Sequence, residues 1–126
     1  MSTAHVLIAA VLLTVFSKAP LAMAQARAGY DNRNPRAQQA QLTGWGARAA
    51  AAHANGFEAF PIFAAGAVLS VATGHDDATG VAIGWAWIAS RVVYTALYVM
   101  DRDKLRSTVW GIGLMLSLSQ YLRAAL

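Results

Sequence analysis

Four long apolar runs constrain this chain more than any other feature of its sequence. They cover about residues 4–24, 43–73, 79–100 and 107–125, and each is close to or above the ~20 residues that a helix needs to cross ~30 Å of hydrocarbon. None alternates strictly between apolar and polar residues, as a barrel strand does. Because lipid cannot satisfy backbone polar groups, each run is expected to form a helix. The sequence therefore predicts one all-α integral membrane domain over residues 1–126, a bundle of four transmembrane helices.

The composition excludes the soluble classes. Charged residues make up 13% of the chain and apolar residues 57%, whereas charged residues are about a quarter of an ordinary soluble domain. A chain of this size buries only about 60–70% of its surface and cannot hide so much apolar area from water. The absence of cysteine excludes a disulfide scaffold. The net charge of +4 does not indicate a nucleic-acid partner, because the basic residues flank the apolar runs instead of forming one solvated patch.

The distribution of basic residues predicts the orientation in the membrane. The connection at residues 74–77 contains no Lys or Arg. The other two connections are rich in them, and a further Arg begins the fourth helix; the six residues are Arg27, Arg33, Arg36, Arg102, Lys104 and Arg106. Since positive loops stay in the cytoplasm, both termini are expected outside, in the periplasm of a bacterial inner membrane.

Local signals refine the expected helix bounds. Ala22-Met23-Ala24 resembles a signal-peptidase site, but the first five residues contain no Lys or Arg, so a retained helix over 4–24 is favoured. Asn34-Pro35 is typical of a helix start. The second helix is therefore expected to run from 35 to 73, roughly 39 residues, with its first part in the cytosol. The other helices are expected at 79–100 and 106–125.

Polar residues of the second helix fall on one face. Asn55 lies about 20° and Glu58 about 80° around the helix axis from Arg48, whereas His53 lies about 140° away. Charges at membrane depth normally face protein or a water-filled cavity. This stripe is therefore either a structural network between helices or part of a ligand site.

The third and fourth helices add a second set of polar groups. Arg91, Tyr94 and Tyr98 have the i, i+3, i+7 spacing of one helix face, and Arg91 either pairs with Glu58 or binds a ligand. Five residues are expected near the cytoplasmic third of the bundle: Arg48, Tyr98, Arg102, Arg106 and Ser107. Such a set suits a small polyanionic ligand, and the apolar walls suit a lipophilic small molecule or lipid.

These residues resemble the signature of the membrane-associated proteins in eicosanoid and glutathione metabolism, the MAPEG superfamily. The segment Asn34-Pro35-Arg36 is followed by Arg48 and then by His53-Ala54-Asn55-Gly56-Phe57-Glu58-Ala59-Phe60-Pro61. The spacing Arg-x(6)-Asn-x-x-Glu-x-x-Pro is fairly specific, and the downstream Arg and Tyr residues strengthen it. The overall pattern looks most like the small bacterial members.

The resemblance implies a homotrimer with glutathione as co-substrate, bound between protomers. Arg106 and Ser107 are then the expected catalytic residues, which favour the thiolate of glutathione. The residues expected to bind glutathione are Arg48, Asn55, Glu58, Arg91, Tyr94, Tyr98 and Arg102. Two positions depart from the family pattern: Ala54 stands where an Arg often precedes the Asn, and Trp110 stands where a Tyr is common.

The leading functional hypothesis is a membrane-bound glutathione transferase or peroxidase acting on a lipophilic electrophile or hydroperoxide. The alternative is a non-catalytic protein of the same fold that binds a lipid or scaffolds a partner. A quinone or haem protein using His53 or His75 is disfavoured, because no two His residues share a helix face at ligand spacing. No metal site is expected.

Overall fold

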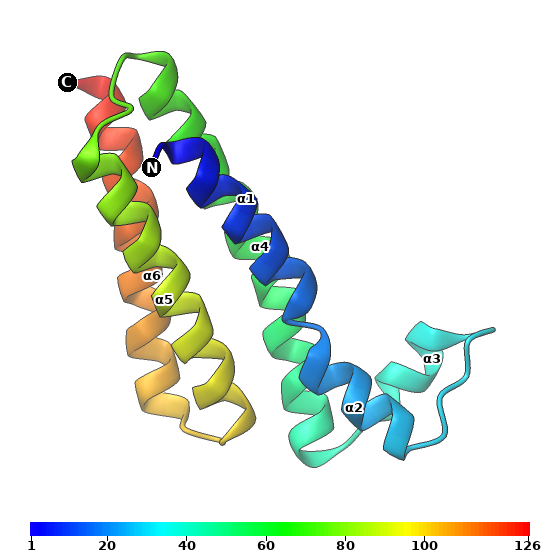
Figure 1. Ribbon diagram of the computed structural model, residues 1–126. Coiled ribbons are helices and arrows are strands. Elements are labelled where there is room, and N and C mark those ends of the chain that lie inside the picture. Colours follow the sequence, from blue (N-terminus) through cyan, green and yellow to red (C-terminus); the bar gives the residue numbers. More distant parts are fainter.

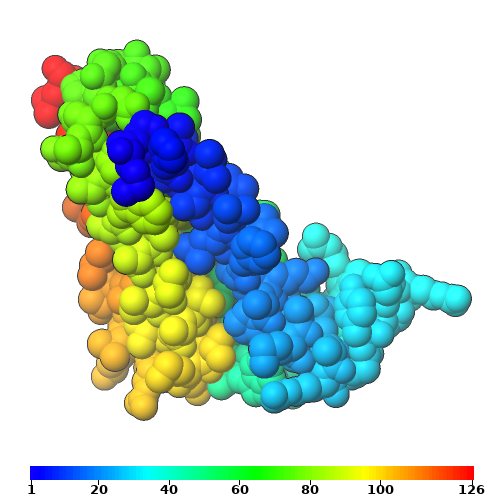
Figure 2. Space-filling view, viewed as in Figure 1, coloured from blue at the N-terminus to red at the C-terminus, as the bar shows by residue number.

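A long helical bundle with a short foot at one end makes up the molecule (Figure 1). The computed structural model describes residues 1–126. The elements are α1 (Thr3–Phe16), α2 (Ala19–Arg27), α3 (Pro35–Ala40), α4 (Gly44–Ala72), α5 (Ala78–Val99) and α6 (Asp103–Ala125). Helices α1, α4, α5 and α6 form the bundle, whereas α2 and α3 project sideways as a foot, which the space-filling view shows as a protrusion continuous with the bundle (Figure 2).

Three segments are long and apolar enough to cross a membrane: Thr3–Arg27, Gly44–Ala72 and Ala78–Val99. The protein is thus an all-helical integral membrane protein. Helix α6 packs against both α4 and α5, but charged residues in its first turns and at Arg123 lower its mean hydropathy. The fourth crossing therefore stays a prediction.

The first predicted helix, 4–24, is interrupted. Helix α1 ends at Phe16 and α2 begins at Ala19. The cause is Pro20, whose ring lacks an N–H and would collide with the carbonyl group four residues earlier, that of Phe16. The chain therefore turns at residues 17–18, and α2 leaves the bundle axis (Figure 1).

The predicted continuous helix over 35–73 is wrong. It does start at Pro35 with Asn34 as the N-cap, but α3 ends at Ala40 and α4 begins only at Gly44. Thr43 is extended, and Gly44 has a φ of +56°, a conformation that glycine adopts far more readily than other residues. The first residues of the predicted helix, 35–40, therefore form α3 of the foot and do not extend α4.

Two glutamines join α3 to α2 within the foot. The buried Gln25 side chain donates from Nε2 to the Pro35 carbonyl oxygen at 3.1 Å and to Gln38 Oε1 at 3.0 Å. In return, Gln38 Nε2 donates to the Gln25 carbonyl oxygen at 3.0 Å. These three bonds hold the foot as one unit.

The core lies between α1, α4 and α5. The rings of Phe63 and Trp87 stack with centroids 4.2 Å apart, and Val6, Ala10 and Ala67 pack around them. Only 23 of the 126 residues are buried. The many apolar side chains left on the outside fit a protein for which lipid is the solvent.

A cluster that we call the terminal clasp joins both chain ends to the 74–77 connection. Asp76 Oδ1 accepts from the Thr3 N–H at 2.9 Å, and Asp77 Oδ1 accepts from the Gly80 N–H at 2.9 Å and from Arg123 Nη2 at 2.7 Å. The Gly80 N–H and the Arg123 guanidinium hold the pKa of the Asp77 carboxyl below its usual value. Both termini thus lie at the end opposite the Arg-rich foot (Figure 1).

Candidate functional site

An amide side chain links a buried cation on α5 to a carboxylate on α4. Arg91 Nη2 donates to Asn55 Oδ1 at 2.6 Å, and Asn55 Nδ2 donates to Glu58 Oε2 at 3.1 Å. The predicted meeting of Arg91 and Glu58 is therefore indirect. The amide of Asn55 mediates it because that group has an acceptor on one side and a donor on the other.

Aromatic rings continue this connection toward α6. The guanidinium carbon of Arg91 lies 4.1 Å from the ring centre of Tyr94, and Tyr94 meets Tyr98 edge-to-face at 5.6 Å. On the other side of Tyr98, the guanidinium carbon of Arg106 lies 4.3 Å from the ring centre. Both cations sit within cation–π range. We call this continuous set the polar file: Glu58, Asn55, Arg91, Tyr94, Tyr98 and Arg106.

Two neighbouring cavities open along the polar file. The first lies between α4, α5 and α6, and the second lies at the start of α6. Polar residues of the first are Asn55, Glu58, Arg91 and Ser117. The second is lined by Tyr94, Tyr98, Arg106, Ser107 and Trp110. Trp110 borders both cavities, so this departure from the family pattern lies within the site.

Burial differs sharply along the polar file. Arg91 and Tyr94 are 6% and 5% exposed, so the middle of the file is inside the bundle. Glu58 and Ser107 are exposed. Carboxylates within membrane-spanning helices normally face protein or a water-filled cavity, and Glu58 lines the first cavity.

Arg48 and Arg102 do not join the site. Arg48 Nε donates to the carbonyl oxygen of Val99 at 3.2 Å, and Arg48 Nη1 lies 3.8 Å from Asp101 Oδ2. Arg48 thus caps the C-terminal end of α5, where free carbonyl groups attract a cation. Arg102 is exposed at the N-cap of α6 and lines neither cavity. Both residues lie at the same end of the bundle as Arg106, as predicted, but neither lines the two cavities.

The sequence predicts apolar walls for the site, but two of the residues that form them, Ile62 and Leu114, were not identified from it. Ala59, Ile62 and Leu114 line the first cavity beside Trp87. A signal was present, since Ile62 and Leu114 follow Glu58 and Trp110 by four residues and so share their helix faces. Ala54 lies elsewhere, in a cavity on the other side of α4.

The MAPEG family profile matches residues 2–126, essentially the whole chain. The chain belongs to the MAPEG family. This confirms the resemblance seen in the spacing of Arg48, Asn55, Glu58 and Pro61, and the family includes glutathione-dependent transferases and peroxidases. No curated protein is similar enough to count as a relative. Within this MAPEG chain, the polar file brings together six of the nine site residues that the sequence predicts, and Ser107 lines the second cavity with them.

Proposed function

We propose that this MAPEG protein is a membrane-bound glutathione transferase or peroxidase that acts on a lipophilic electrophile or hydroperoxide. The observation that supports the proposal is the polar file, which links Glu58 on α4 to Arg106 on α6 beside two cavities.

The charges of the polar file match those of glutathione. Glutathione carries two carboxylates, one ammonium group and a thiol. Arg91 and Arg106 offer guanidinium groups for its anionic groups, and the exposed Glu58 offers a carboxylate for the ammonium. Arg48 and Arg102 line neither cavity, so the proposal includes no contact between these residues and glutathione bound in the same protomer.

Arg106 and Ser107 are the proposed catalytic residues. A cation and a hydroxyl donor beside the sulfur lower the thiol pKa from about 8.5 and so raise the fraction of the nucleophilic thiolate. The thiolate then attacks an electrophilic carbon, forming a C–S bond as the leaving group departs with the bonding electron pair. With a hydroperoxide it attacks the outer oxygen and breaks the O–O bond, which gives the sulfenic acid of glutathione and an alkoxide that takes up a proton to become the alcohol. A second glutathione reduces the sulfenic acid, forming glutathione disulfide and water. Ile62, Leu114 and Trp110 provide an apolar wall for the lipophilic partner.

The exposed Glu58 also supports the proposal of a homotrimer in which each site is completed by a neighbouring protomer. An intramembrane carboxylate on an outer face is costly unless protein covers it. We further propose the bacterial inner membrane, with α3 and the connection before it in the cytoplasm and the terminal clasp in the periplasm, because Arg27, Arg33 and Arg36 lie at or beyond the end of α2.

Thiolate absorbance on addition of glutathione, measured against pH, tests the function. In Arg106→Ala, a rise of one to two units in the pKa of the bound thiol should leave roughly 10- to 100-fold less thiolate at neutral pH. Lys104→Ala is the matched control, because Lys104 is an exposed cation on the same helix that lines neither cavity. If the wild type gives no thiolate signal, the catalytic proposal is wrong.

A further inference from the structure

The turn between α5 and α6 separates two members of the polar file, Tyr98 and Arg106. Tyr98 lies in the last turn of α5, and Arg106 lies in the first turn of α6. The guanidinium carbon of Arg106 is nevertheless 4.3 Å from the centre of the Tyr98 ring. The place of Arg106 over this ring, and so beside the second cavity, therefore depends on the shape of the connection at residues 100–102.

This connection has the hydrogen bonds of a Schellman motif. The Asp101 N–H donates to the Tyr98 carbonyl oxygen at 3.1 Å, and the Arg102 N–H donates to the Leu97 carbonyl oxygen at 2.9 Å. Asp101 occupies the left-handed position of the motif with a φ of +61°, where glycine is usual. It is the one residue other than glycine with a positive φ. Because a Cβ atom disfavours this conformation, the turn gains from support by another part of the molecule.

Arg48 of α4 contacts both parts of this turn. The bonds of the motif use the carbonyls of two earlier residues and leave that of Val99, which accepts from Arg48 Nε at 3.2 Å. Arg48 Nη1 lies 3.8 Å from Asp101 Oδ2, so the same guanidinium also faces the carboxylate of the left-handed residue. The two side chains are 30% and 71% exposed, so the ion pair is the weaker contact and the hydrogen bond to Val99 is the main one.

We propose that Arg48 is a positioning residue for the reaction. It fixes the α5–α6 turn against α4 and so holds Arg106 over Tyr98, without touching glutathione itself. This inference rests on the proposed function, which assigns Arg106 to the thiolate. Lysine is a poor substitute for Arg48, because the rigid guanidinium directs separate N–H groups at the carbonyl and the carboxylate, whereas an ammonium is a single point of charge.

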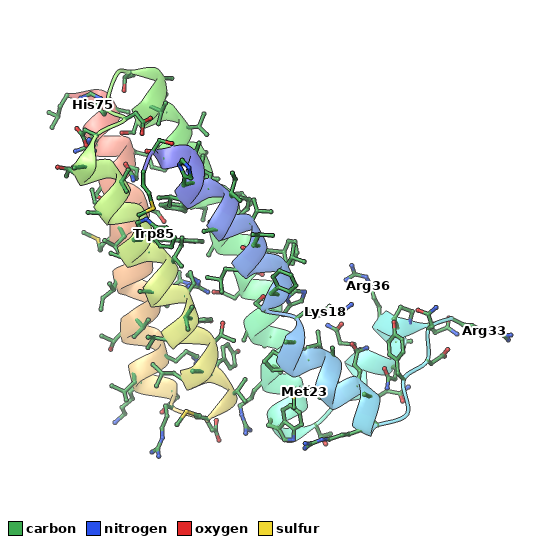
Figure 3. The ribbon with its side chains drawn as sticks, viewed as in Figure 1. Lys18, Met23, Arg33, Arg36, His75 and Trp85 are labelled. Carbon is green, nitrogen blue, oxygen red and sulfur yellow. The ribbon has the colours of Figure 1, made fainter.

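Thiolate absorbance at saturating glutathione, measured against pH, is the first test. Arg48→Gln should raise the pKa of the bound thiol by about half a unit, which leaves about three-fold less thiolate at neutral pH. In the Arg106→Ala background the same substitution should change the thiol pKa no further, because Arg48 acts only through Arg106. Arg48→Lys should restore part of the loss. Arg33→Gln is the matched control, since Arg33 lies at the tip of the foot (Figure 3), and it should titrate as the wild type does.

The second test needs no glutathione. A fluorinated tyrosine at position 98 reports by ¹⁹F NMR on the cation that faces its ring. Arg106→Ala should move this resonance, and Arg48→Gln should move it in the same direction by a smaller amount. Arg33→Gln should leave it in place. If the wild type gives no thiolate signal but the resonance behaves in this way, the catalytic proposal is wrong and the positioning of Arg106 by Arg48 is still supported.

Three results would overturn the inference. An equal effect of Arg48→Gln in the wild type and in the Arg106→Ala background would mean that Arg48 acts on glutathione directly. An unchanged thiol pKa in Arg48→Gln, or an unchanged resonance at position 98, would mean that the turn does not need Arg48. If Arg48→Gln does not fold, Asp101→Asn replaces it, because asparagine tolerates the left-handed conformation and removes only the ion pair. The resonance should then move less than in Arg106→Ala, and no movement would count against the proposal.

Discussion

At the scale of single residues, Asn55 has the most demanding position. It accepts from Arg91 and donates to Glu58, so its amide connects two opposite charges without allowing them to touch. The reversed amide would place its NH₂ group against a guanidinium and its oxygen against a carboxylate, both repulsive. The orientation of Asn55 is therefore fixed by its neighbours.

Asn55→Ala should lower the free energy of unfolding by about 1–3 kcal/mol, because a buried guanidinium loses its hydrogen-bond acceptor. Unfolding of the protein in mixed micelles, with increasing amounts of a denaturing detergent, measures the change in the free energy of unfolding. Asn34→Ala is the control, since Asn34 is exposed and its side chain makes no cap bond, and it should stay within about 0.5 kcal/mol of the wild type. Equal stability of the two variants would show that the bridge contributes nothing.

Much of the site could be predicted residue by residue, but Arg48 could not. The spacing of Arg91, Tyr94 and Tyr98 determines their common face, because neighbours on a helix surface follow from its geometry alone. Arg48 starts on the face of Asn55 but reaches sideways to the end of α5. A long flexible side chain goes where its partner lies, and the carbonyl of Val99 belongs to another helix.

At the scale of elements, close approach of α4 and α6 depends on Gly66. A Cβ atom at this position would lie 2.6 Å and 2.7 Å from two ring carbons of Tyr121. The ring cannot easily move away, because the Tyr121 hydroxyl donates to the Ile62 carbonyl oxygen at 2.9 Å. The contact between the two helices is therefore set by the absence of a side chain.

Gly66→Ala should destabilise the protein by about 1–3 kcal/mol through overpacking. Gly111→Ala is the matched control on α6, because a Cβ there meets nothing within 4 Å; it should be neutral or slightly stabilising. Unfolding in mixed micelles compares the two. Should both variants lose the same stability, helix packing at Gly66 would not be the cause.

The helix bounds show which features could be predicted from the sequence and which could not. The apolar runs predict the main helices, and Asn34-Pro35 predicts the start of α3, since these are local signals. The signal of Pro20 was visible as well, and the structure shows that it ends a helix. The foot was not predictable, because the bonds of Gln25 to Pro35 and Gln38 join segments across a connection.

At the scale of the whole molecule, the exposed apolar surface and the exposed Glu58 support assembly. The protein should have three times the 13.3 kDa chain mass in a gentle detergent, after correction for bound detergent. Light scattering across protein concentrations measures it. A monomeric mass at every concentration would contradict the trimer.

The terminal clasp should make stability depend on acid pH. Since Asp77 has a pKa below its ordinary value of 3.8 in the folded state, its contribution is complete above that value and is lost as the pH falls through the folded pKa. The coupling between Asp77→Asn and Arg123→Gln in a double-mutant cycle should thus be present at pH 7 and shrink below about pH 4. A coupling that persists unchanged at pH 3 would contradict this assignment.

The same clasp makes the chain almost a closed ring. Consecutive carboxylates hold Thr3, near one end of the chain, and Arg123, near the other, so a short linker could join residue 126 to residue 2. New ends could then open in the connection at residues 28–34, which lies outside every helix of the bundle. The order in which the helices occur along the chain would change while every contact between them stayed the same. Native-like stability of such a permuted chain would show that the packing of the bundle depends on which helices meet and not on which one is made first.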